Sequence, residues 1–154
     1  MPSKTSIILC TYNEANHIEN TIFQLEKNIS DLEIVIVDDN SSDGTVEIIK
    51  RLNQNNKYKV VFRKKSRSLA SAFVRGLTET NGSYIGWLDT NMGELSSKFK
   101  DMINELKSNN DLVLMSRFVD GGGDDRIFLR AFCSKYFNLL CRLILRTTIK
   151  DFTS

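Results

Sequence analysis

The sequence lacks the features that define several broad classes of protein. Its formal net charge is only +2 over 154 residues, which does not indicate a nucleic-acid-binding protein. No uncharged apolar run approaches the roughly 20 residues that are needed to span a bilayer. The first residues lead directly into a predicted strand, without the pattern of a signal peptide.

Cysteine is scarce, and its three positions exclude two kinds of site. Cys10, Cys133 and Cys141 do not have the spacing of a zinc site. Cys133 and Cys141 lie on one predicted helix and are separated by about 12 Å, which is too far for a disulfide bond. We therefore expect reduced thiols and a cytosolic protein.

The charge that is present is distributed unevenly. Six of the 21 basic residues and no acidic residue lie between Arg126 and Lys150, which leaves 15 basic against 19 acidic residues elsewhere. A basic segment on a mildly acidic body predicts a local anionic partner for residues 126–150.

Strand and helix patterns alternate along the chain and predict one domain over residues 1–154. Short apolar runs predict strands at 6–9, 34–37, 60–62, 84–88 and 112–115. Helical periodicity separates them, near 18–29, 46–52, 69–77 and 99–106. Because the strands are continuously apolar, we predict a doubly wound, mostly parallel α/β sheet with helices on both faces. Ligands bind such sheets beyond the carboxyl ends of the strands.

Polar residues stand at four of these predicted strand ends. They are Thr11, Tyr12, Asn13 and Glu14 after the first strand, Asp38 to Thr45 after the second, Asp89, Thr90 and Asn91 after the fourth, and Arg117 after the fifth. Alone, each has an ordinary interpretation; Asp43-Gly44-Thr45, for example, is typical of a helix cap. Together they predict a site for hydroxyl groups, a metal and a phosphate. No Gly-x-Gly-x-x-Gly loop follows the first strand, which disfavours a dinucleotide-binding dehydrogenase.

These strand ends resemble the motifs of family 2 glycosyltransferases of GT-A fold. The resemblance is carried by Thr-Tyr-Asn-Glu, by Val-Asp-Asp-Asn-Ser-Ser-Asp-Gly-Thr and by the Asp-x-Asp-like turn at Asp89. Three further matches resemble the polyprenyl-phosphate sugar transferase branch: Ser116-Arg117-Phe118, Gly121-Gly122-Gly123 and Asp151-Phe152-Thr153-Ser154. The last resembles the start of an Asp-x-Thr-Ser-Gly-Phe signature. We therefore expect a catalytic domain that is truncated at its C-terminus.

The resemblance implies a role for each residue. The donor, a GDP- or UDP-linked sugar, would contact Thr11, Tyr12, Glu14, Val37, Asp39, Asp89, Thr90 and Arg117. Asp89 and Arg117 would be the catalytic residues. Asp89 and Asn91 would hold Mg²⁺ or Mn²⁺, which neutralises charge on a diphosphate leaving group. Arg130 and Ser134 would bind the phosphate of a polyprenyl-phosphate acceptor. The resemblance implies inversion at the sugar and a peripheral location at the cytoplasmic membrane face.

The Asp89 turn departs from the family pattern. Its second carboxylate is the amide Asn91, and Gly93 stands where a polar ligand is usual. Mg²⁺ is often held by one or two carboxylates and substrate phosphates, so Asp89 with the Asn91 carbonyl would suffice, and Glu94 is a substitute ligand. The alternative is a donor-binding module whose metal site has decayed. Cys10 also replaces the family's usual proline.

The acceptor places its own demand on the site. A phosphate monoester is mostly ionised near neutral pH, with a second pKa of about 6, and needs no strong general base. This agrees with a chain whose single histidine, His17, is predicted to be a surface or capping residue. A soluble sugar acceptor would require a base, for which Glu94 and Asp120 are the candidates.

Two basic segments have two interpretations each. The basic amphipathic segment at 126–150 would lie in a membrane interface or pack on the core with its arginines extended to solvent. The cluster from Arg63 to Arg67 would be a solvated loop or a contact for phosphate or lipid headgroups, with Ser68 as the N-cap of the next helix.

Overall fold

The computed structural model describes residues 4–64, 68–117, 128–147, 149, 151 and 152, and at 128–130 the backbone alone. The chain divides into two compact units, Met1–Asn109 and Asn110–Ser154. Each unit is described by itself.

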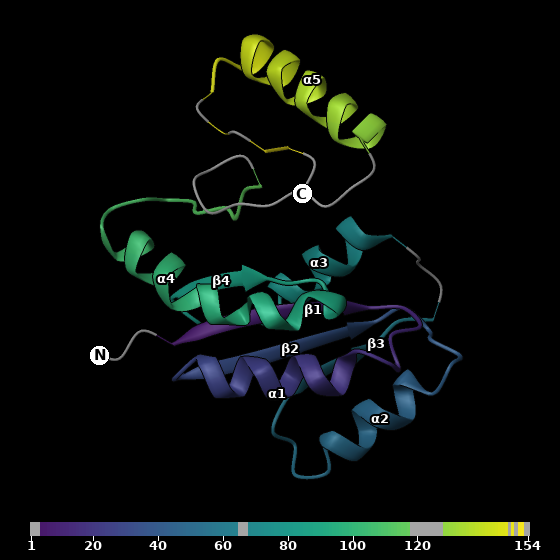
Figure 1. Ribbon diagram of the computed structural model, residues 1–154. Helices are drawn as coiled ribbons and strands as arrows, with labels where there is room; N and C mark the ends of the chain where they lie inside the picture. The colour runs from purple at the N-terminus through teal and green to yellow at the C-terminus, as the bar shows by residue number, and fades with distance from the viewer. Residues whose placement is uncertain (1–3, 65–67, 118–127, 148, 150, 153–154) are drawn as a thin grey trace. The chain divides into compact units, whose positions relative to one another are not determined.

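The first unit is built on a sheet of four parallel strands. These are β1 (Thr5–Thr11), β2 (Leu32–Asp38), β3 (Lys59–Phe62) and β4 (Tyr84–Trp87), in the order β3-β2-β1-β4 (Figure 1). The connections contain α1 (Ile18–Asn28), α2 (Thr45–Leu52) and α3 (Leu69–Leu77), and β4 is followed by the 3₁₀ helix η1 (Thr90–Lys98) and α4 (Phe99–Lys107). The strand order reverses between β1 and β4, and such a switch point is where α/β sheets bind ligands.

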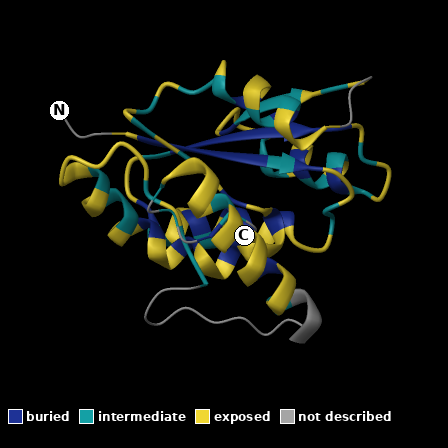
Figure 2. Cartoon of the chain, turned by 90° about the horizontal axis from the view of Figure 1, so that it is seen from above, coloured by how far each residue is buried: buried dark blue, intermediate teal, exposed yellow. Residues whose placement is uncertain are grey.

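Helices cover both faces of the sheet, as the sequence predicted. On one face Ile8, Val35 and Val37 pack with Ala72 of α3. On the other, Ile7 and Phe99 of α4 approach Gly86 so closely that a Cβ there would lie 2.6 Å from one and 2.9 Å from the other. The central strands β1 and β2 are buried, the edge strands β3 and β4 are only partly buried, and the outer surfaces of the helices are exposed (Figure 2). The doubly wound α/β architecture is therefore confirmed.

The predicted fifth strand is not formed. Residues 112–116 carry no strand, and the side chains of Leu112 and Leu114 are 64% and 50% exposed. A strand is stable only when its backbone pairs with a neighbour, and this short run has no such partner in the described structure. The second unit instead contains α5 (Phe128–Leu145), which lies within the predicted basic segment.

A buried carboxylate joins three strands at the amino end of the sheet. Glu33 accepts hydrogen bonds from the Ser6 hydroxyl at 2.5 Å and the Asn81 backbone N–H at 2.8 Å, and ion pairs with Lys4 at 3.0 Å and Lys59 at 3.1 Å. Burial raises the pKa of Glu33, but the hydrogen bonds from Ser6, Asn81, Lys4 and Lys59 outweigh it and lower the pKa to about 2.

We predict that Glu33→Gln lowers the free energy of unfolding at pH 7 by about 2–3 kcal/mol. The folded pKa lies below the ordinary value of 4.5. The stabilisation is therefore complete above about pH 5 and is lost as the pH falls towards 2. Urea unfolding at a series of pH values should show the variant and the wild type converging in acid.

The matched control is Glu47→Gln, on the exposed surface of α2. This variant should follow the wild type at every pH. A constant difference between Glu33→Gln and the wild type down to pH 2 would contradict the assignment.

Candidate functional site at the carboxyl ends of the strands

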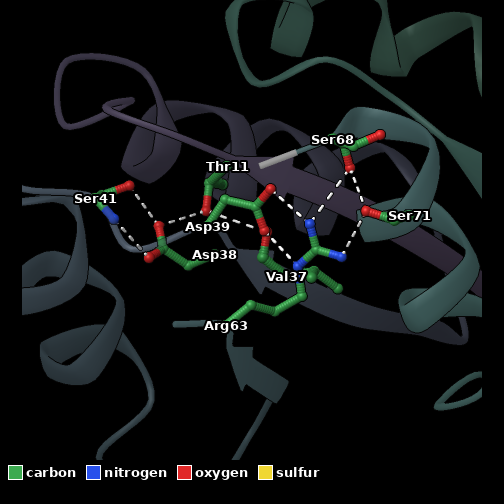
Figure 3. A network of polar contacts seen from close by, with 8 residues as sticks. All are labelled: Thr11, Val37, Asp38, Asp39, Ser41, Arg63, Ser68 and Ser71. Atoms are coloured by element: carbon green, nitrogen blue, oxygen red, sulfur yellow. Dashed lines mark hydrogen bonds and ion pairs between the residues drawn. The ribbon is translucent and has the colours of Figure 1, made fainter. Parts of the chain in front are cut away.

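A fully buried carboxylate holds the ends of β1 and β2 together. Asp38 accepts hydrogen bonds from the Thr11 hydroxyl at 2.9 Å, the Ser41 hydroxyl at 2.5 Å and the Ser41 backbone N–H at 3.0 Å (Figure 3). Its side chain has no exposed surface. Asp38 therefore has a structural role, since each donor compensates the desolvation of its charge.

The two loops that follow these strands are bonded to each other along their length. The Asn13 backbone N–H donates to the Ser41 hydroxyl at 2.9 Å, and the Asn13 amide oxygen accepts from the Ser42 N–H at 2.9 Å. The Glu14 N–H donates to the Thr45 hydroxyl at 2.8 Å. Asn13 adopts a left-handed backbone with φ of 59°, which asparagine tolerates better than most residues. Several polar groups of these two motifs thus hold the two loops in one conformation.

The segment Asp43-Gly44-Thr45, which the sequence predicts to cap a helix, forms a turn held by hydrogen bonds to the Asp43 carboxylate. Gly44 occupies the N-cap position of α2 with φ of 100°, and the Asp43 carboxylate accepts from the Thr45 N–H at 3.1 Å and the Ala15 N–H at 3.0 Å. The hydrogen bond from the Thr45 hydroxyl lowers the pKa of Asp43. Asp43 therefore supports the loops, and the N-cap position itself belongs to Gly44, which makes no side-chain capping hydrogen bond.

The neighbouring carboxylate, Asp39, forms a two-point ion pair with Arg63. Arg63 Nε lies 2.5 Å from Asp39 Oδ1 and its Nη2 lies 2.6 Å from Oδ2. Arg63 also donates to the Ser71 hydroxyl at 3.0 Å and the Ser68 carbonyl at 3.3 Å (Figure 3). A paired geometry of this kind fixes both groups. The orientation of Asp39 is thus set from β3 and α3.

The solvated interpretation of the basic loop is therefore wrong for Arg63, whose side chain is only 11% exposed. Residues 65–67 of the same cluster lie outside the described residues. Ser68 does occupy the N-cap position of α3, although its side chain makes no capping hydrogen bond. The strand order could have revealed Arg63, because β3 lies beside β2 and the residue after it stands next to Asp39.

Asp89 follows β4, which pairs with β1 on the side opposite β2. Burial and then the charge of Asp39 raise the pKa of the Cys10 thiol to about 11; Arg63 opposes this, and Asp89 adds to it. Cys10 thus lies within the electrostatic field of both carboxylates. The two acidic motifs, which are fifty residues apart in the sequence, meet around the end of β1.

The other residues predicted to bind the sugar donor differ in the exposure of their side chains. The Thr11 side chain is buried and bonded to Asp38, and Val37 packs in the core beneath α3. Tyr12 is exposed and Glu14 is half-buried. Tyr12 and Glu14 therefore have side chains that a ligand can reach, whereas Asp39 is 6% exposed and paired with Arg63, and Thr11 and Val37 are buried.

The predicted metal ligands are at the surface. Asp89, Asn91 and Glu94 are exposed, and Asp89 begins a turn in which its carbonyl accepts from the Met92 N–H at 2.9 Å. Among the described residues, no three acidic, histidine or cysteine side chains gather as a ligand cluster. The residues present fit an ion that takes one or two protein ligands and completes its shell with substrate phosphates.

In the second unit, Arg117 is paired with Asp151. Arg117 Nε and Nη2 lie 2.9 and 2.8 Å from the two Asp151 oxygens, and the Asn138 amide of α5 contacts the same carboxylate at 3.4 Å. Asp151 is buried, as are Asn138 and Ser134. The sequence pointed to Asp151 only as the start of a signature, so this pairing was missed.

Several residues of the predicted site lie outside the described structure. They are Phe118, Asp120, Gly121 to Gly123, Arg126, Thr153 and Ser154, together with the side chain of Arg130.

The first unit is an α/β fold in which acidic residues follow the strands that flank the switch point of the sheet. The chain matches the family model described as Glycosyl transferase family 2 over residues 6–154, and it belongs to that family. A dolichol-phosphate mannosyltransferase from Pyrococcus furiosus is 33% identical over 121 residues, which cover 77% of this chain and 34% of that protein.

Two further relatives extend this comparison. A cholesterol galactosyltransferase from Borreliella burgdorferi is 28% identical over 116 residues, covering 75% of this chain and 32% of that protein. A mannosyltransferase from Pyrobaculum calidifontis, solved in complex with GDP-Man and Mn²⁺, matches with a TM-score of 0.56 and 24% identity over 65% of this chain and 32% of that one. The predicted GT-A-like fold is confirmed. The chain spans about a third of the length of these curated relatives.

We predict that Cys10 reacts with iodoacetamide far more slowly than the exposed Cys133. Because only the thiolate reacts and the pKa of Cys10 is about 11, its rate should rise roughly tenfold per pH unit through pH 10. Mass spectrometry of the alkylated peptides gives both rates in one sample. A Cys10 rate that levels off near pH 8 would contradict the raised pKa and, with it, the burial that is its main cause.

Proposed function

We propose that the chain is the donor-binding part of an inverting enzyme that transfers a sugar from a nucleoside diphosphate to a polyprenyl phosphate. The observation that carries this proposal is the placement of Asp39 and Asp89 on either side of the β1 end, with Asp39 fixed by Arg63. Family membership and the similarity to a dolichol-phosphate mannosyltransferase support it.

The nucleoside would bind between the first two loops. Glu14 and Asp39 would supply carboxylate oxygens that accept hydrogen bonds from ribose hydroxyls or base N–H groups, Asp39 while it keeps its ion pair with Arg63. Tyr12, whose side chain is 44% exposed, offers a ring at the mouth of the crevice. The hydrogen bonds between the loops hold these three residues in place before a ligand arrives, so less conformational entropy is lost on binding.

The diphosphate would lie towards the end of β4. Asp89 and the Asn91 carbonyl would hold Mg²⁺ or Mn²⁺ there, with Thr90 beside them and Glu94 as a further ligand. Such an ion, when bound, neutralises charge that develops on the leaving diphosphate. The Pyrobaculum mannosyltransferase was solved with Mn²⁺ and GDP-Man, which agrees with this assignment.

The proposed reaction does not require a general base. An oxygen of the acceptor phosphate forms a bond to the anomeric carbon of the sugar while the bond from that carbon to the diphosphate breaks. The electron pair leaves with the nucleoside diphosphate, and the configuration inverts. The attacking oxygen is already ionised, so no general base is needed. Arg117 would stabilise phosphate charge, and Asp151 fixes the plane of its guanidinium.

The acceptor side is supported by the unusual surface of α5. Among residues 131–145, where its side chains are described, the buried positions are the polar Ser134 and Asn138, whereas Leu143 and Ile144 are each 70% exposed. Exposed apolar side chains also include Phe132, Tyr136, Phe137, Leu139, Leu140 and Leu145. A helix that packs through polar residues and exposes apolar ones fits a lipid interface better than a core. Arg130 and Ser134 would bind the acceptor phosphate there.

A membrane interface is distinct from a membrane span. None of the helices in the described residues has the length and apolarity that crossing a bilayer requires. The proposal is therefore a peripheral association with the cytoplasmic face of the membrane through α5, whose exposed Lys135 and Arg142, together with Arg146 directly after the helix, would meet anionic headgroups.

One observation favours a second candidate function. Asp89 is the only carboxylate of its turn before Glu94, and the described residues contain no three-ligand cluster. A module that binds the donor without a metal would have this appearance. A hydroxyl acceptor, such as the one named for the Borreliella relative, would in addition require a general base.

We predict that GDP or UDP binds in a manner that Mn²⁺ strengthens and that Asp89→Ala abolishes this strengthening. Trp87, 42% exposed and two residues before Asp89, would report binding through its fluorescence. Loss of a ligand should weaken the apparent Mn²⁺ affinity at least about tenfold. Asp101→Ala, on the exposed side of α4, is the matched control and should behave as the wild type.

The pattern of binding separates the two functions. Nucleotide binding that ignores Mn²⁺ in the wild type would favour the metal-free module. Nucleotide binding that survives in Asp39→Ala would contradict the placement of the nucleoside.

We predict that the chain co-sediments with phosphatidylcholine–phosphatidylglycerol vesicles and less with phosphatidylcholine alone. The double variant Leu143→Gln and Ile144→Gln should reduce binding several-fold, because it removes exposed apolar surface. Phe23→Gln, which removes an apolar side chain of α1 that is 61% exposed, is the control. Equal loss in both variants, or binding unaffected by either, would contradict an interfacial role for α5.

A further inference from the structure

The helix that follows Asp89 has a buried stripe of small residues. Along η1 the buried positions are Thr90, Gly93 and Ser96, and Phe99 continues the series into α4. A 3₁₀ turn has three residues, so every third residue lies on one side, and the burial keeps this spacing across a kink at Met92, whose φ of −113° and ψ of 24° are not helical. The residues between them, including Asn91 and Glu94, are exposed.

This stripe packs against α1, and Thr21 is the central contact. Thr21 is buried, and its hydroxyl donates a hydrogen bond to the carbonyl oxygen of Thr90. A Cβ at Gly93 would lie 2.8 Å from the Thr21 Oγ1 and 2.9 Å from its Cα. At the far end of η1, Asn28 of α1 donates to the Ser96 hydroxyl at 2.8 Å.

The packing accounts for the glycine in the turn. A side chain at position 93 would meet the backbone of α1, so this position cannot carry a ligand that reaches the crevice. Polar side chains near Asp89 are confined to the exposed positions 91 and 94. The close approach at Gly93 and the hydrogen bond at Thr90 therefore set where the Asp89 turn lies.

We infer that Thr21 is a positioning residue for the Asp89–Asn91 turn. Its hydroxyl donates a hydrogen bond to the Thr90 carbonyl, and its backbone lies in close contact with Gly93. Thr21 belongs to none of the strand-end motifs. The consequence for metal affinity rests on the proposed function, whereas the effect on the turn itself does not.

The test compares Thr21→Val, which keeps the shape and removes the donor, with Thr21→Ser, which keeps the donor. Ser96→Ala is the matched control, since it removes one buried hydrogen bond from the far end of the same contact. Two quantities are measured on the whole chain: amide hydrogen exchange of residues 88–94 without ligand, and the Mn²⁺ dependence of nucleotide binding.

Thr21→Val should speed exchange in residues 88–94 and weaken the apparent Mn²⁺ affinity about tenfold, as removal of a supporting group around a metal ligand commonly does. Thr21→Ser should restore both values, and Ser96→Ala should leave both near those of the wild type. Gly93→Ala approaches the same contact from η1 and should reproduce the Thr21→Val result, which keeps the test open if Thr21→Val does not fold.

Unchanged exchange in Thr21→Val and Gly93→Ala, or equal effects in Ser96→Ala, would overturn the inference. If exchange responds as expected but the wild type shows no Mn²⁺ dependence, the positioning role stands and the proposed metal role fails. The two failures are therefore distinguishable.

Discussion

The buried carboxylate of Asp38 is the constraint on which the site depends. Its hydrogen bonds from Thr11 and Ser41 join the ends of β1 and β2, and the bonds between Asn13 and the second loop extend that junction. A charge with no exposed surface is tolerated only when its oxygens are satisfied. The loops must therefore keep this conformation, and Asp39 is placed beside β3, where Arg63 fixes it.

Both ends of the sheet contain buried carboxylates, but only the carboxyl end also carries accessible ones. At the amino end Glu33 is surrounded by lysines and hydrogen-bond donors, so its charge serves stability. At the carboxyl end Asp89 is exposed and Glu14 is half-buried. Their charges are accessible to a ligand. In parallel α/β sheets the carboxyl ends carry the binding site, and here the amino end supplies the stability that accessible acidic groups do not.

In the second unit, buried polar residues support the structure while apolar side chains are exposed. Asp151 is buried and holds Arg117, and Asn138 joins that pair to α5. The polar face of α5 is thus used inside the unit, and its apolar face lies outside. Such an arrangement is costly in water unless the apolar surface has a function, because burial of apolar surface is the dominant favourable contribution to folding.

The sequence by itself determined the alternation of strands and helices in the first unit, because periodicity records which side of each element is buried. It also determined that acidic residues follow β1, β2 and β4. It did not show that Asp38 and Asp39 have different hydrogen-bond partners or that Arg63 forms an ion pair and is not solvated. It also did not show that residues 112–115 form no strand. Only the tertiary structure decided these, because burial, ion pairing and strand formation depend on which segments become neighbours. Local patterns do not record strand order, and the contact of Gly93 with Thr21 joins residues that no spacing connects.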